Sequence, residues 1–324
     1  MNASKVCRKK RCSFCTTDEV RRFGKTAAGA QRFQCCTCLR TFTWQQPEAR
    51  RTHEQHWFLL WLEEGYSLRE LRIQSGHLRR KLQRIIHEWL QRSPDVPTSL
   101  LRSATHLVAD GTFLERRTTC VFGVMDGTRH EIIAGAYGVH EFAPAHLRTF
   151  FGGLRARGLA PTSATVDGNP RLAGVLREIF PGIIIQRCVV HVQRQGLMWC
   201  RRYPKRAAGK HLRALFLRVA RIATPAERDA LLSDILAWEA RYGATLARAS
   251  EGGWVASDLK RARSMLLHAL PNLFHYLDDP EIPSSTSMME GYFSRMKELY
   301  RGHRGLARKH RSAYFRWHFA NNRF

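Results

Sequence analysis

The chain has 324 residues, of which 44% are hydrophobic, so it is long enough for more than one domain and too apolar for a disordered tail. Its 53 lysines and arginines against 27 aspartates and glutamates give a formal net charge of +26. Such a charge opposes folding unless a polyanion relieves it, which favours nucleic acid as the partner. No apolar run approaches the length of a membrane span and no secretory signal follows the basic first residues, so we expect no membrane partner and a cytoplasmic protein.

The N-terminal segment, residues 1–46, holds most of the cysteines in two C-x-x-C pairs that are 19 residues apart. Two such turns complete a tetrahedron of thiolates, which predicts a zinc ribbon with one structural Zn²⁺. The expected ligands are Cys12, Cys15, Cys35 and Cys38. Cys7 or Cys36 could replace one of them, and the alternative reading is a set of spare thiols. Metal binding supplies free energy that so short a segment lacks, on the order of 10 kcal/mol.

Residues 47–93 show three short helical patterns, which predict a helix-turn-helix DNA-binding domain. Ser67 and Glu70 form a capping-box pattern at the start of the second helix, and residues 75–76 end that helix. The third helix carries basic side chains suited to the major groove and to phosphates, namely His77, Arg79, Arg80, Lys81 and Arg84. The alternative is an ordinary three-helix bundle with a charged face.

Residues 94–192 change to the period of a sheet, and we expect an α/β fold there. Expected strands cover residues 106–110, 118–125, 131–139, 162–168 and 183–190, and expected helices cover residues 144–158 and 170–180. The order β-β-β-α-β-α-β is that of a ribonuclease H-like mixed sheet. Residues 193–283 read as an all-α insertion, after which residues 284–324 return to the catalytic core, starting with a helix over residues 288–300.

Two acids, Asp110 and Asp167, each end a predicted strand and precede a glycine. Neighbouring strands bring their carboxylates together, and a divalent cation removes the resulting repulsion. Together with Glu290 they offer the hard oxygen ligands that two Mg²⁺ ions prefer. The alternatives are ordinary turn aspartates and, for Glu290, a capping box with Ser287.

Four segments in this order resemble the Mutator-like DDE transposases of bacterial insertion sequences. They are residues 109–112, residues 165–169, residues 180–191 with Cys188 and His191, and residues 285–291. The resemblance covers the chain from about Leu107 onward, and it departs at Ser287, where many relatives have Asn. It implies that Asp110, Asp167 and Glu290 ligate two Mg²⁺ or Mn²⁺ ions.

The same resemblance implies a Cys-x-x-His pair at Cys188 and His191, for which we expect a structural hydrogen bond near the site rather than a second zinc site. It further implies a bacterial, nucleoid-associated transposase that binds terminal inverted repeats and target sites in double-stranded DNA. We expect metal-dependent strand cleavage, strand transfer, and a homodimer or higher assembly on DNA. The alternatives are a domesticated DNA-binding regulator and a ribonuclease H-like structure-specific nuclease.

Overall fold

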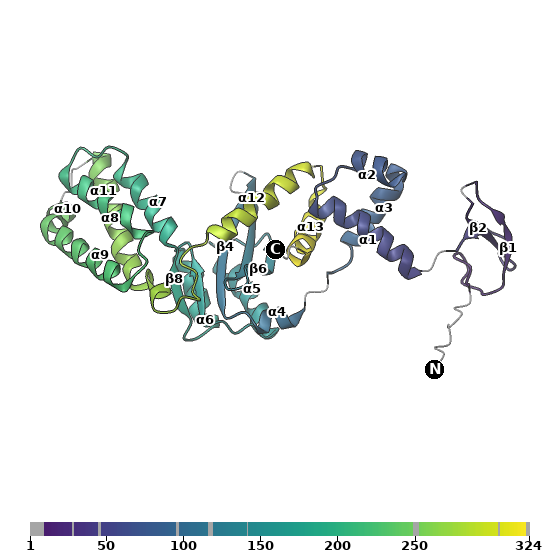
Figure 1. Cartoon of the computed structure of the whole chain (residues 1–324), viewed down its shortest axis with the longest axis horizontal. Coiled ribbons are helices and arrows are strands. Elements are labelled where there is room, and N and C mark those ends of the chain that lie inside the picture. Colours follow the sequence, from purple (N-terminus) through teal and green to yellow (C-terminus); the bar gives the residue numbers. More distant parts are fainter. Residues whose placement is uncertain are drawn as a thin grey trace.

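The computed structural model describes residues 10–321 except 28, 45–46, 95–96, 116–118, 141, 249–252 and 304. Along the long axis of Figure 1, a small cysteine-bearing sheet lies at one end, a mixed sheet with its helices lies in the middle, and a helical bundle lies at the other end. None of the helices in these residues is both long and apolar enough to cross a membrane.

The cysteine-bearing sheet is three-stranded and antiparallel, with the strands β1 (Val20–Lys25), β2 (Gln31–Cys35) and β3 (Thr41–Thr43). Phe33 pairs with Phe42 across β2 and β3, and both rings are buried beside Cys12 and Cys35. So small a core buries too little apolar surface to hold the segment folded without a cross-link.

The helix-turn-helix segment consists of α1 (Pro47–Glu63), α2 (Leu68–Ser75) and α3 (Arg79–Leu90). The capping box predicted at α2 is present: the Glu70 amide donates to Ser67 Oγ at 3.3 Å, and the Ser67 amide donates to Glu70 Oε2 at 2.7 Å. This reciprocal pair satisfies two amide groups that a helix start leaves without partners.

The central sheet has five strands in the order β6-β5-β4-β7-β8. Strands β4, β5 and β6 are antiparallel, whereas β4, β7 and β8 are parallel, so the mixed α/β architecture expected from the sequence is confirmed. The strands are β4 (His106–Glu115), β5 (Thr119–Asp126), β6 (Glu131–Tyr137), β7 (Ser163–Val166) and β8 (Ile184–Arg187), and the short helix α4 (Thr98–Arg102) precedes them.

Two expected strand ends are wrong. Strand β4 does not end at Asp110 but runs to Glu115, because its second half pairs with β5 in an antiparallel hairpin. Strand β8 does not reach Val190 but stops at Arg187, because Cys188 caps a helix by accepting the His191 amide on Sγ at 3.4 Å. The helical insertion therefore starts at Val189, earlier than expected.

Each face of the sheet carries its own helices. Helices α5 (Pro144–Ala156) and α6 (Pro170–Ile179) cover the face that contains Leu107 and Ala109. Helices α12 (Ser287–Gly302) and α13 (Arg308–Asn321), drawn in yellow in Figure 1, pack with the face that contains Val108. Helix α13 is not among the elements expected from the sequence.

The helix-turn-helix shares its hydrophobic core with α12 and α13, although the expected boundary lies at residue 93. Phe58 packs edge-on against Trp317 of α13 with ring centroids 5.1 Å apart. Trp317 Nε1 donates to the Trp89 carbonyl at 2.9 Å, and His303 Nε2 lies 2.8 Å from the Trp61 carbonyl. The boundary at residue 93 is therefore not a division between hydrophobic cores.

The helical insertion forms a separate bundle with its own core. Its elements are α7 (Val189–Cys200), α8 (Ala207–Val219), α9 (Pro225–Trp238), the π-helical turn η1 (Glu239–Gly243), α10 (Ala244–Arg248), α11 (Gly253–Ala269) and the 3₁₀ turns η2 (Leu270–Asn272) and η3 (His275–Leu277). A linker then leads back across the sheet to α12 (Figure 1).

Candidate active site

Asp110 and Asp167 each lie just past the parallel pairing of two neighbouring strands, β4 and β7. The register pairs Leu107 with Ala164 and Val108 with Thr165, a constant offset of 57 residues, and the same offset carries Asp110 to Asp167. Neighbouring strands lie about 4.8 Å apart. The two carboxylates therefore stand where β4 and β7 separate, which is the edge of their parallel pairing.

Helix α12 brings Glu290 over the same face. Asp110 pairs with Gly123 of β5, so both positions point to the face that α12 covers. A Cβ on Gly123 would lie only 3.3 Å from Met289 Sδ and from the Phe293 ring. The absence of a side chain at Gly123 thus lets α12 approach the sheet closely, next to the strand position of Asp110.

Glu290 does not act as a helix cap. The N-terminal cap of α12 is Thr286, which makes no side-chain capping bond, so the capping-box alternative with Ser287 is wrong. Instead, Arg194 Nη1 of α7 lies 2.8 Å from Glu290 Oε2, and His191 Nε2 lies 3.5 Å from Glu290 Oε1. Two cations of the helical insertion therefore hold the carboxylate of α12.

Cys188 and His191 connect the insertion to the start of α12. The Thr286 amide donates to Cys188 Sγ at 3.3 Å, and Thr286 Oγ1 lies 3.2 Å from His191 Nδ1. The hydrogen bond with Cys188 is the largest cause of a rise in the pKa of His191, which burial opposes. Together with the charges of Cys188, Asp110 and Glu290, it raises the pKa of His191 to about 9. A charged His191 then faces the carboxylates with Nε2.

Steric crowding explains why glycine follows Asp167. Gly168 has φ +107°, and a Cβ there would overlap the guanidinium of Arg187. Arg187 Nη1 donates to the Gly168 carbonyl at 3.2 Å, and Asp167 Oδ1 accepts the Asn169 amide at 2.9 Å. The turn therefore places a cation from β8 beside Asp167.

The acids suit hard cations. Burial first, and then the Asp167 carboxylate, raise the pKa of Asp110 to about 7, and Glu290 adds to this rise. A divalent ion would relieve that repulsion, and carboxylate oxygens are the donors that Mg²⁺ and Mn²⁺ prefer. Asp110, Asp167 and Glu290 are not, however, among the described sets whose donor atoms all lie within 4.8 Å of one another.

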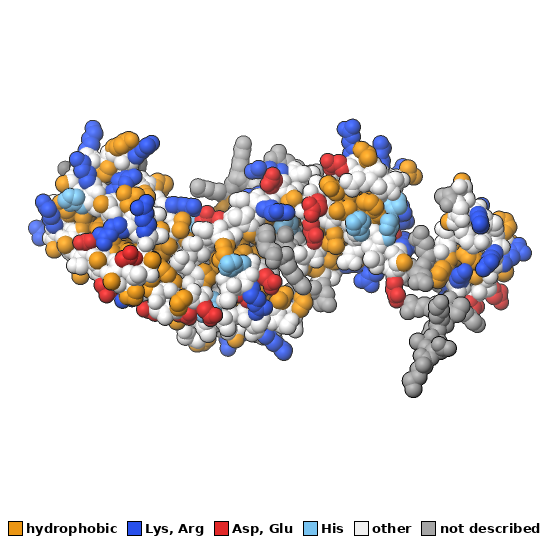
Figure 2. Space-filling view, viewed as in Figure 1, with side chains coloured by type: hydrophobic (Ala, Val, Ile, Leu, Met, Phe, Trp, Pro, Cys, Tyr) orange, Lys and Arg blue, Asp and Glu red, His pale blue; other side chains and the backbone are white. Residues whose placement is uncertain are grey.

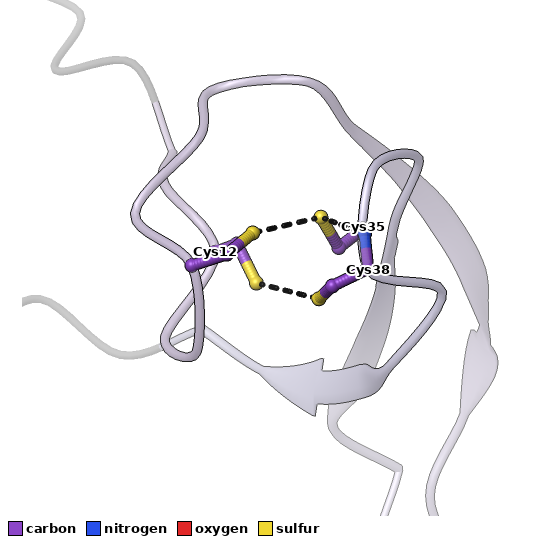
Figure 3. A group of neighbouring side chains, drawn as sticks. Cys12, Cys35 and Cys38 are labelled. Atoms are coloured by element: carbon purple, nitrogen blue, oxygen red, sulfur yellow. Dashed lines mark hydrogen bonds between the residues drawn. The ribbon is translucent and has the colours of Figure 1, made fainter.

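The four cysteines do form such a set. Cys12 Sγ lies 3.6 Å from Cys38 Sγ, and Cys15 Sγ lies 3.4 Å from Cys35 Sγ. A tetrahedral Zn²⁺ with bonds of about 2.3 Å separates its sulfur ligands by about 3.8 Å, so the thiols fit this ion. Figure 3 shows thiols of the two loops pointing toward each other. Cys36, in contrast, is exposed and outside the set.

A protein-family model described as "Transposase, Mutator family" matches residues 74–251, which is more than half of the chain. The chain belongs to the Mutator family of transposases. No curated protein matches its sequence. The matched part of this transposase contains Asp110, Asp167, Cys188 and His191 and ends before Glu290, so it includes neither the cysteine ribbon nor α12.

The residues predicted to contact DNA divide into two groups. Arg79, Arg80 and Arg84 are exposed on α3, as expected. His77 and Lys81 are only half-exposed, and Lys81 Nζ lies 3.2 Å from His77 Nε2, so these two side chains contact each other. Arg79 also lines a hollow of about 560 Å³ between α3 and residues 302–310.

Three positively charged residues near the acids were missed by the sequence analysis: Arg187, His191 in its role as a charged partner, and Arg194. Arg187 also lines a hollow of about 600 Å³ with Trp199, Lys260, Arg261, Ser264, Met265 and His268 of the insertion. Figure 2 shows Lys and Arg side chains over the insertion, the helix-turn-helix and the ribbon. The basic charge is thus carried at both ends of the molecule.

Proposed function

We propose that this Mutator-family transposase binds the terminal inverted repeats of an insertion sequence and catalyses metal-dependent DNA strand cleavage and strand transfer. The observation that carries the proposal is the register that sets Asp110 opposite Asp167, with Glu290 delivered to the same face by α12. Family membership supplies the class of substrate, DNA. We assign the sheet to the ribonuclease H-like class on its strand order and mixed pairing.

Asp110, Asp167 and Glu290 are the proposed ligands of two Mg²⁺ or Mn²⁺ ions, which when bound activate the attacking oxygen and stabilise the leaving oxygen. Water first attacks the phosphodiester at the element end and releases a 3′-OH. That 3′-OH then attacks a target phosphodiester in line, so no covalent bond to the enzyme forms. His191 and Arg194 pair with Glu290, and their positive charge favours the approach of the DNA backbone.

The cysteine ribbon, with one structural Zn²⁺, and α3 are the proposed DNA-recognition elements. The support is the four-thiol set in the ribbon and the exposed arginines of α3. Two element ends have to be brought together for strand transfer, so we propose a homodimer or a higher assembly on DNA.

The test uses the full-length protein and a duplex that ends in the inverted repeat of its own element. Asp110→Asn and Asp167→Asn should bind this duplex with normal affinity but lose Mg²⁺- or Mn²⁺-dependent cleavage by at least about a hundredfold. Glu131→Gln is the matched control, because it removes an acid from the edge strand β6 of the same sheet.

The rival functions give different results in the same assay. A domesticated regulator binds the repeat but does not cut it with any metal. A structure-specific nuclease cuts branched DNA without preference for the repeat. Cleavage that persists in Asp110→Asn would contradict the proposed site itself.

A further inference from the structure

A second set of mixed metal-type ligands lies at the first residue of β4, His106, four residues before Asp110. The donor atoms of His106, Asp279 and Glu281 all lie within 4.8 Å of one another. His106 Nε2 is 3.4 Å from Glu281 Oε2, and the Glu281 amide donates to Asp279 Oδ1 at 3.1 Å. Nothing in the proposed transposition chemistry uses these three residues.

The imidazole of His106 is held as metal-ligating histidines are held. The residue is only 5% exposed, and its Nδ1 lies 2.9 Å from Oγ of the fully buried Ser163. When Nδ1–H donates to that hydroxyl, Nε2 carries the free lone pair and faces Asp279 and Glu281. A hydrogen bond of this kind fixes both the tautomer and the ring orientation.

The set is separate from the catalytic acids. His106 is four residues before Asp110 on β4, which is about 13 Å along an extended strand. Asp279 and Glu281 belong to the linker between the insertion and α12. The three residues thus join the first residue of the central strand to the end of the helical bundle.

We propose that His106, Asp279 and Glu281 form a structural site for a divalent ion of the zinc class, which holds the end of the helical insertion against the sheet. One imidazole and two carboxylates suit Zn²⁺ better than Mg²⁺, which favours oxygen donors alone. Three protein ligands leave a coordination position that water fills at this surface.

An ion pair alone is a weaker explanation of the geometry. Glu281 is 66% exposed, and an exposed pair of this kind is worth about 0–1 kcal/mol. Such a pair gives no reason for a buried imidazole whose Nε2 faces two carboxylates at once. A shared cation converts both carboxylates from mutually repelling neighbours into ligands.

The position of the site gives it a mechanical role. After Glu281 the linker is held at three further points: Thr165 Oγ1 donates to the Pro283 carbonyl at 2.5 Å, the Val189 amide donates to the Ser284 carbonyl at 3.0 Å, and the Thr286 amide donates to Cys188 Sγ at 3.3 Å. The proposed ion precedes these attachments along the chain. It lies where the chain leaves the bundle, so it restrains the segment that leads to Glu290.

The zinc content of the protein tests the proposal directly. Full-length wild type and the Asp279→Asn/Glu281→Gln variant are saturated with Zn²⁺, desalted and analysed for zinc per chain. We expect one zinc fewer in the variant, since the ribbon cysteines and the catalytic acids are the same in both proteins. Asp279→Asn keeps the acceptor for the Glu281 amide, so the local turn is retained.

A matched control changes two exposed acids elsewhere, Glu178→Gln and Asp229→Asn, and should keep the wild-type zinc content. A second variant, Glu281→Gln alone, changes only an exposed side chain and should lower the affinity for the lost zinc at least tenfold. Equal zinc content in wild type and the double variant overturns the proposal, and so does an unchanged affinity in Glu281→Gln. Circular dichroism of each variant excludes unfolding as the cause of a lower content.

Discussion

The ribbon and the face of the sheet that carries Asp110 present their candidate metal ligands in opposite ways. In the ribbon, four thiols from two loops already lie within 4.8 Å of one another. On the sheet, the three carboxylates do not form such a set, and Glu290 is held by Arg194 and His191. One ligand set is assembled by the fold, whereas the other is held by charged side chains.

The difference follows from the size of the hydrophobic core around each ligand set. The buried core of the ribbon consists of two phenylalanines and two cysteines, so a zinc ion bound by its thiols would contribute directly to folding. The sheet has a large hydrophobic core on each face, which stabilises it without a metal cross-link. Five experiments test this contrast.

Removal of the ribbon zinc should have the largest effect. Cys12→Ser/Cys15→Ser should lose one zinc per chain and unfold the ribbon, because metal binding contributes on the order of 10 kcal/mol to such a segment. Metal analysis and limited proteolysis of the full chain check this. Cys36→Ser, at an exposed cysteine outside the set, is the control and should keep the zinc. Retained zinc in the double variant would contradict the assigned ligands.

Glu290→Gln should reduce metal-dependent cleavage by at least about a hundredfold, because it removes a charged ligand of the proposed ions. DNA binding and folding should remain, since Glu290 makes no helix cap. Gel shift and cleavage on the same duplex separate the two effects. Glu298→Gln, an exposed acid on the same helix, is the control. If Glu298→Gln instead lost cleavage, the third ligand would be Glu298.

A fall in pH should lower the free energy of unfolding, through a histidine buried in the core beneath α12. Burial lowers the pKa of His318 to about 4, and Nδ1 of this residue lies 2.8 Å from the Tyr292 hydroxyl. Between pH 6.5 and 4 the unfolded chain binds a proton at His318 that the folded chain does not, so stability falls as pH falls, by about 3 kcal/mol at most. Denaturant unfolding across this range measures the slope. His318→Gln should flatten it, and an unchanged slope would assign the acid loss to other groups.

Arg194→Gln should lower the Mg²⁺ concentration for half-maximal cleavage several-fold. Arg194 pairs with Glu290, so a metal ion has to compete with this guanidinium for the carboxylate. A metal titration of the cleavage rate gives the value. Arg194→Lys keeps the charge and should stay near wild type. A higher Mg²⁺ requirement in Arg194→Gln would show that Arg194 assists the metal site instead.

The smallest effect is expected for a single arginine on the proposed DNA-binding surface of α3. Arg80→Ala should weaken binding to the inverted repeat and reduce the slope of log K against log salt by about one unit, as for one lost phosphate contact. Arg157→Ala, an exposed arginine after α5, is the matched control. Equal slopes for both variants would show that DNA is recognised by a surface other than α3.

Local patterns were predicted from the sequence because their causes are local. The Ser67–Glu70 capping box spans four residues and is present as predicted. The two Asp-Gly pairs lie just past the parallel pairing of β4 and β7, although β4 itself continues to Glu115. Family membership, which the four motifs indicated, is confirmed by the match over residues 74–251.

Contacts between distant segments could not be predicted in this way. Arg194 and Glu290 are 96 residues apart, and on its own sequence Arg194 looks like part of a solvated helical face. The capping-box pattern at Ser287 was a false local signal, since tertiary contacts hold Glu290. Helix α13 was missed because it buries mostly aromatic residues between basic ones, so its apolar face is clear only against the core it joins.

The hydrophobic core that the helix-turn-helix shares with α12 and α13 sets the separation between α3 and α12. Trp89 lies at the end of α3, and Trp317 of α13 donates to its carbonyl, while α13 and α12 pack in the same core. The helix proposed to read the element end and the helix that carries Glu290 therefore pack in one hydrophobic core. Under the proposed function, this aromatic packing would fix the number of base pairs between the bases that α3 reads and the bond that is cut.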